Sequence, residues 1–122
     1  MNEEKGKRNW IFCDGDLPPA GNEEPFGHEA LIITNVIKEE AQISIDILFE
    51  DKEPKKGIKL NVGGERVKCI RLDKPVGKDG YQIPKGQYSL VLHCNTPVVA
   101  VFGRLDVRQP NLAYYSVQGY GY

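Results

Sequence analysis

Glycine and proline residues constrain the fold of this chain more than any other feature. Thirteen glycines and eight prolines are spread along 122 residues, and they separate short runs that are rich in β-branched side chains. Both residue types destabilise the interior of a helix, so the chain leaves no room for a long amphipathic helix. The pattern predicts an all-β fold.

About eight short strands are expected between these turn-forming residues. They cover residues 9–13, 29–35, 42–50, 57–62, 66–72, 87–94, 98–108 and 113–118. The clearest is 42–50, where Ile43, Ile45 and Ile47 alternate with polar residues, so that one face lies in the core. Residues 30–33 are apolar on both faces, which predicts a central strand or one covered at an interface. We therefore expect a single-domain antiparallel β-sandwich or a jelly-roll-like barrel.

The length and the 40% hydrophobic content suit one domain with one core. We divide the chain into a flexible charged N-terminus (1–8), a β-sandwich ligand-binding domain (9–118) and a C-terminal tail (119–122). No apolar run approaches the roughly 20 residues that span a bilayer, and the charged N-terminus lacks the apolar segment of a signal peptide, so a cytoplasmic protein is expected. The net charge of −1 provides no basic field, so nucleic acid is not an expected partner.

Two local expectations follow from the turns and the cysteines. Residues 95–97 are short enough to close a hairpin between the strands on either side. Cys13, Cys69 and Cys94 each lie in an apolar, strand-like run, which predicts reduced thiols in the core.

Residues 98–109 carry the most informative charge pattern. Alternation puts Val99 and Val101 on a core face, and it puts Arg104, Asp106 and Arg108 on the opposite face. Asp106 would then lie within reach of both arginines and hold their guanidinium groups. Two interpretations stay open: an exposed or interfacial ion-pair ladder, and a ligand-binding face.

Catalytic and metal-binding patterns are missing from the sequence. The serines lack a nucleophile elbow, and no Cys–His–acid grouping is evident. His28-Glu29 has no metal-ligand continuation, and the other histidine is His93, so neither a metal nor a cofactor is expected. The chain is therefore predicted not to be an enzyme. Trp10 and the tyrosines are expected to pack in the core or at a subunit interface, or to stack on a ligand.

Several short segments occur in a specific order along the chain. They are Trp10-x-x-x-Asp14-Gly15-x-Leu17-Pro18-Pro19-x-Gly21, His28-Glu29, Asp51-Lys52-Glu53-Pro54, Asn95-Thr96-Pro97 and Arg104-Leu105-Asp106-x-Arg108-Gln109. From about Trp10 to Ser116, this ordered set resembles the sensory rhodopsin transducer family. The resemblance implies a cytoplasmic β-sandwich that assembles as a homotetramer, and the namesake member relays signals from a microbial rhodopsin. It also implies likeness to domains proposed to bind sugars.

The function expected from these observations is a non-catalytic sensory or adaptor domain for signal transduction, which binds a small molecule such as a sugar or sugar acid. The candidate ligand-binding residues combine one aromatic ring with charged and polar groups. They are Trp10, His28, Glu29, Arg66, Arg104, Asp106, Arg108 and Gln109. Two alternatives stay open: an adaptor that binds only proteins, for example a membrane receptor, and a DNA-binding regulator.

Overall fold

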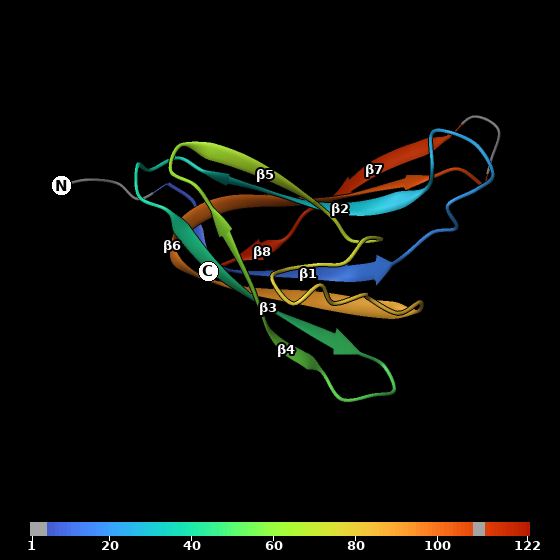
Figure 1. Ribbon diagram of the computed structural model, residues 1–122, viewed down its shortest axis with the longest axis horizontal. Coiled ribbons are helices and arrows are strands. Elements are labelled where there is room, and N and C mark those ends of the chain that lie inside the picture. Colours follow the sequence, from blue (N-terminus) through green and yellow to red (C-terminus); the bar gives the residue numbers. More distant parts are fainter. Residues whose placement is uncertain (1–4, 109–111) are drawn as a thin grey trace.

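The computed structural model describes residues 5–108 and 112–122, and every regular element in this part of the chain is a β-strand (Figure 1). The all-β prediction is confirmed. The strands are β1 (Lys7–Asp16), β2 (His28–Asn35), β3 (Ala41–Phe49), β4 (Lys55–Val62), β5 (Arg66–Arg71), β6 (Gln87–Asp106), β7 (Ala113–Val117) and β8 (Tyr120–Gly121). No helix in the described part of the chain is long and apolar enough to cross a membrane.

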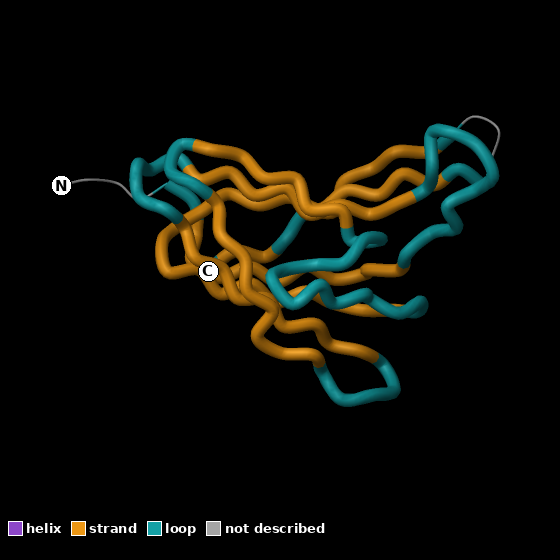
Figure 2. The backbone as a smooth tube through the Cα atoms, viewed as in Figure 1, coloured by secondary structure: helices purple, strands orange, loops and turns teal. Residues whose placement is uncertain are grey.

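The strands form two layers that share β6, and all of their pairings are antiparallel. The first layer has the order β4-β3-β6-β1-β8, and the second has the order β5-β2-β6-β7. Figure 2 shows the strands gathered in these layers, with the loop between β1 and β2 closing one end. Since β2 has neighbours on both sides, the prediction of a central strand around residues 30–33 is confirmed.

The long strand β6 corrects the hairpin that we expected at residues 95–97. Residues 87–106 form one continuous strand, whose N-terminal half pairs with β1 and β3 and whose C-terminal half pairs with β2 and β7. A hairpin would need the two halves to pair with each other, but β1 and β3 already occupy both sides of the N-terminal half. Asn95 anchors this transition, because its side-chain Oδ1 accepts a hydrogen bond from the Gln42 backbone N–H at 2.8 Å.

The core lies between the layers. Ile43, Ile45 and Ile47 of β3 are buried as their alternation predicts. Phe12 and Phe102 stack on each other across the layers, and the ring of Trp10 stacks on Phe12 with a centroid distance of 5.9 Å. Trp10 is partly buried at the margin of this core.

The faces of the C-terminal half of β6 are the reverse of those we expected. Phe102 and Arg104 point into the protein, whereas Val99 and Val101 are exposed. The predicted core face is therefore wrong. Valine occurs on both faces of this segment, so the alternation could not determine which face of the strand is buried against the first layer.

The cysteines also divide differently from the prediction. Cys94 is buried as expected, but Cys13 and Cys69 are exposed. These two residues lie on the outer faces of their layers, where an apolar neighbourhood along the chain does not imply burial in the fold.

Candidate functional site

A buried ion pair between Glu29 and Arg104 is the polar centre of the molecule. Glu29 on β2, Arg104 on β6 and Tyr115 on β7 are direct neighbours across the second layer. The Arg104 Nε donates a hydrogen bond to Glu29 Oε2 at 2.6 Å, and Arg104 Nη1 donates to the Tyr115 hydroxyl. The Glu29 side chain is completely buried, so this charge depends on its partners inside the protein.

The first layer supplies the remaining partners of this pair. The Tyr88 hydroxyl donates to Glu29 Oε1 at 2.5 Å, and the backbone N–H of Asp16 lies 3.1 Å from both carboxylate oxygens. Arg104 Nη2 donates to the Asp14 carbonyl at 2.5 Å. Every buried side-chain nitrogen and oxygen among the described residues has a hydrogen-bond partner. We call Glu29, Arg104, Tyr88 and Tyr115 the inter-layer cluster, because they join the two layers.

An irregularity in β1 positions the backbone groups of this arrangement. The pairing of β1 with β6 shifts register between Phe12 and Gly15, and Asp14 adopts a φ of 65°. Such a bulge re-aims the groups next to it, here the carbonyl of Asp14 and the N–H of Asp16. At Gly15 a Cβ atom would lie 2.5 Å from the Tyr88 ring, so glycine makes room for that ring.

The charges of the inter-layer cluster are set by burial and by close partners. Burial raises the pKa of Tyr88, and the negative charge of Glu29 raises it further. For Arg104, burial opposes the charged form, but hydrogen bonds and Coulomb attraction, chiefly with Glu29, leave its pKa raised. At neutral pH Tyr88 is therefore a neutral phenol and Arg104 a charged guanidinium.

Asp106 and Arg108 form a separate pair near the end of the sandwich. Arg108 Nε lies 3.0 Å from both oxygens of Asp106, and Arg108 Nη2 also contacts this carboxylate. Hydrogen bonds from Arg108 lower the pKa of Asp106 to about 2. The prediction that Asp106 holds both arginines is wrong, because Arg104 turns inward to Glu29.

The other predicted site residues are dispersed. The Trp10 Nε1 donates to the carbonyls of Lys7 and Val98 in the first layer. His28 lies one residue before Glu29, and its Nδ1 lies 2.8 Å from the Phe26 carbonyl oxygen. Arg66 pairs with Asn35 at the opposite end of β2. Gln109 lies outside the described residues. The structure thus brings Glu29 and Arg104 together but forms no pocket from the full predicted set.

Sequence reasoning missed Tyr88 and Tyr115 in this cluster. Tyr88 alternates with Leu90 and Leu92, which would have placed it on the core face, and a buried tyrosine hydroxyl requires a hydrogen-bond partner. Tyr115 gave no such signal, because only the pairing of β7 with β6 puts it beside Arg104. Among the described residues, no group of His, Cys, Asp and Glu side chains could hold a metal ion.

The fold and the inter-layer cluster define a small antiparallel β-sandwich domain in which one long strand serves both layers. The chain belongs to the Anabaena sensory rhodopsin transducer family, whose model matches residues 5–121. The resemblance noted in the sequence is thereby confirmed. No curated protein sequence matches the chain.

Two solved structures are similar over most of the chain. The crystal structure of Thermotoga maritima 1070 has 33% sequence identity and a TM-score of 0.83, and the match covers 100% of this chain and 97% of the other. The Anabaena sensory rhodopsin transducer has 34% identity and a TM-score of 0.73, with 89% of this chain and 96% of the other covered. This chain is therefore a transducer-type domain.

Proposed function

We propose that this chain is a non-catalytic sensory or adaptor domain that binds a small molecule. The inter-layer cluster supports a structural role for the Glu29–Arg104 pair, because no buried side-chain nitrogen or oxygen among the described residues lacks a hydrogen-bond partner. Catalytic groups, by contrast, need a free face toward a substrate.

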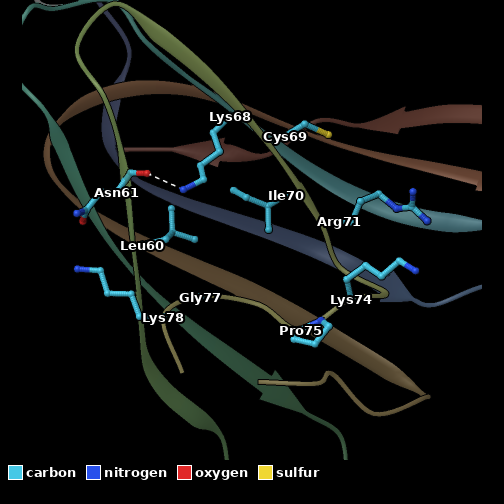
Figure 3. Close-up of a pocket in the computed structure, with 10 residues that line it drawn as sticks. All are labelled: Leu60, Asn61, Lys68, Cys69, Ile70, Arg71, Lys74, Pro75, Gly77 and Lys78. Carbon is cyan, nitrogen blue, oxygen red and sulfur yellow. Dashed lines mark hydrogen bonds between the residues drawn. The ribbon is translucent and has the colours of Figure 1, made fainter. Parts of the chain in front are cut away.

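A cleft at the open edge of the sandwich is the observation that carries the proposal. It lies between the edge strands β4 and β5 and the loop that follows β5 (Figure 3), and its volume is about 510 Å³. This volume lies within the range of small-molecule sites. We propose this cleft as the ligand site in place of the predicted set around Arg104, Asp106 and Arg108.

A thermal-shift screen tests the small-molecule function. We would measure the thermal midpoint against monosaccharides, sugar acids and small carboxylates, each over a range of concentrations. A ligand that binds the folded state raises the midpoint as its concentration increases. If none of these compounds shifts the midpoint at millimolar concentration, the small-molecule function is rejected.

A second candidate function is a protein-interaction adaptor, and the outer face of the second layer favours it. Ile32 lies between Val101 and Cys69 in one row of this face, and Val99 and Val67 flank Thr34 in the next row. We call these residues the outer apolar face. Val67, Val99, Val101 and Cys69 are all exposed, and such a patch is typical of an interaction site.

We propose that a second copy of this chain covers the outer apolar face. The two rows carry no charged side chain, so the face can meet a copy of itself about a two-fold axis without like-charge repulsion. This contact would be one interface of the homotetramer that the family resemblance implies. Sedimentation showing a monomer of about 14 kDa at micromolar concentration would reject self-association, and the face would then be assigned to another protein, such as a membrane receptor.

A further inference from the structure

We infer that the cleft between β4 and β5 binds a small organic anion that carries at least two negative charges. Lys68, Arg71, Lys74 and Lys78 would supply the positive charges that recognise it. The inference rests on the proposed small-molecule function and names the class of ligand.

The charge of the cleft differs from that of the whole molecule. The chain as a whole has 16 basic and 17 acidic residues. The cleft is lined by Leu60, Asn61, Lys68, Cys69, Ile70, Arg71, Lys74, Pro75, Gly77 and Lys78. Four of these ten residues are cationic and none is acidic, so positive charge is concentrated around one hollow of a nearly neutral protein.

The four cations lie around two largely buried apolar side chains, and the charged ends of Arg71, Lys74 and Lys78 extend away from them. Figure 3 shows the side chains of Leu60 and Ile70 in the middle of the cleft, with Lys68 and Arg71 on β5 and Lys74 and Lys78 on the adjoining loop. A ligand that suits this arrangement has an apolar body or ring with anionic groups at its periphery. Separated charges on the ligand would match separated cations on the protein.

Intramolecular partners engage only part of this positive charge. Arg71 forms a two-point ion pair with Asp73, with both distances at 2.8 Å, and Lys68 Nζ donates to the Asn61 carbonyl at 3.0 Å. A hydrogen bond to a carbonyl leaves the charge of Lys68 uncompensated. Lys74 and Lys78 form no ion pair with a residue in the described part of the chain. The Asp73 carboxylate is therefore the one ion-pair partner of these four cations among the described residues.

Protection of the sheet edges does not account for this arrangement. Lysines on edge strands prevent strands of other molecules from pairing there, which would explain Lys68. Lys74 and Lys78 lie instead in the loop between β5 and β6 and are not part of a strand. Their placement is explained by a ligand that enters between the loop and the strands.

Contacts with β4 hold this loop in place before any ligand binds. The backbone N–H of Lys78 donates to the Lys59 carbonyl at 3.0 Å, and Val76 pairs with Tyr81 across the turn of the loop. At Gly77, which has a φ of 77°, a Cβ atom would lie 2.3 Å from the Ile58 side chain. Close packing against β4 thus fixes the path of the loop, and a preorganised site loses less entropy on binding.

Titration of the protein by two-dimensional NMR tests the inference. The probes are citrate and isophthalate, a benzene ring with two carboxylates, at constant ionic strength, with glucose as the neutral comparison. Both anions should saturate the protein, and the largest chemical-shift changes should fall on the amides of residues 68–71 and 74–78. In the double variant Lys74→Gln/Lys78→Gln, affinity for both anions should fall by about tenfold or more.

The matched control is Lys56→Gln/Lys85→Gln, which removes the same charge from two exposed lysines outside the cleft. Its affinity should stay within about twofold of the original protein. Equal losses in the two double variants would show a nonspecific charge effect and overturn the site. The site would also be overturned if neither anion saturates the protein at about 20 mM.

The remaining outcomes separate this inference from the proposed function. Saturation by glucose, with shifts away from the cleft, would keep a small-molecule function and overturn the anion class. Binding of duplex DNA through the same lysines, with a steep salt dependence and without saturation by citrate, would identify a nucleic-acid site instead.

Discussion

At the scale of single residues, the charge of Glu29 depends on donors from both layers. Tyr88 of the first layer supplies one of them, because its hydroxyl donates to Glu29 Oε1 at 2.5 Å. Hydrogen bonds to charged groups in the interior contribute more than those between neutral groups. Tyr88 is therefore the residue at which the inter-layer cluster can be tested without removing a charge.

Tyr88→Phe should lower the free energy of unfolding at pH 7 by about 2 kcal/mol, because the ring is kept and one donor to a buried carboxylate is lost. The folded-state pKa of Tyr88 lies above its unfolded value, so its contribution is complete below about pH 10 and decreases as pH rises further. The difference in free energy of unfolding between the original protein and Tyr88→Phe should thus decrease above pH 10, by up to about 1.4 kcal/mol per pH unit. Urea denaturation from pH 7 to 11 measures both effects.

The matched control is Tyr81→Phe, since the Tyr81 hydroxyl donates no side-chain hydrogen bond within the described residues. This variant should show neither the loss at pH 7 nor the narrowing. If Tyr88→Phe unfolds with the same free energy as the original protein, the hydrogen bond to Glu29 contributes nothing.

The three thiols should differ in reactivity. Burial raises the pKa of the Cys94 thiol to about 11, whereas Cys13 and Cys69 are exposed. Iodoacetamide at pH 8 should therefore modify Cys13 but not Cys94 in the folded protein, and all three thiols in urea, as counted by mass spectrometry. Cys69 should react in the free subunit and be protected where a second copy covers the outer apolar face. Rapid modification of Cys94 in the folded protein would contradict its position in the core.

At the scale of elements, the C-terminal strand β8 covers one edge of the first layer. The backbone N–H groups of Asn9 and Tyr122 each donate to the other residue's carbonyl, and Gly121 pairs with Trp10. The C-terminal residues, which the sequence suggested were a tail, therefore continue the sheet. They also pack beside the one tryptophan of the chain.

Deletion of residues 119–122 should expose the Trp10 ring and open the edge of β1. We expect a red shift of the tryptophan emission and a thermal midpoint lower by about 4–8 °C, which corresponds to roughly 1 kcal/mol. Tyr120→Ser is the control, because Tyr120 is largely exposed and the backbone ladder is retained. If the deletion leaves the emission unchanged, β8 does not cover Trp10 in solution.

At the scale of the whole molecule, two surfaces with different chemistry lie at different places on the sandwich. The second layer presents the outer apolar face, and the edge between β4 and β5 presents a positively charged cleft. If the ligand binds the oligomer and the free subunit with different affinities, ligand binding shifts the equilibrium between these two states. A domain with one surface for a ligand and another for a second copy can respond to its ligand in this way.

Val101→Lys should dissociate the proposed oligomer without unfolding the subunit. Val101 lies beside Ile32 in the outer apolar face, and a lysine there would place like charges against each other across a two-fold contact. In the free subunit the same lysine is exposed, so the far-ultraviolet circular dichroism should not change. Val36→Lys is the control, since Val36 is equally accessible but lies outside that face. A Val101→Lys protein that sediments like the original would exclude the face as the interface.

The amino-acid sequence by itself determined the all-β class, the positions of most strands and the buried face of β3. Those features depend on local chemistry: glycine and proline prevent long helices, and a two-residue alternation says which side chains of one strand lie together. The sequence also identified the family, through motifs spread along the chain. The Asp14-Gly15 motif proved structural, because it forms the bulge that aims two backbone groups at the inter-layer cluster.

Only the tertiary structure decided the course of β6, the direction in which Arg104 points and the composition of the cleft. Each depends on residues distant in sequence: Glu29 and Arg104 are 75 positions apart, and the cleft joins β4 to the loop beyond β5. The residue pattern around 98–109 was ambiguous, since it has valines on both faces. The pairing of β2 and β7 with β6 resolved it, because that pairing sets which face of the strand meets the opposite layer.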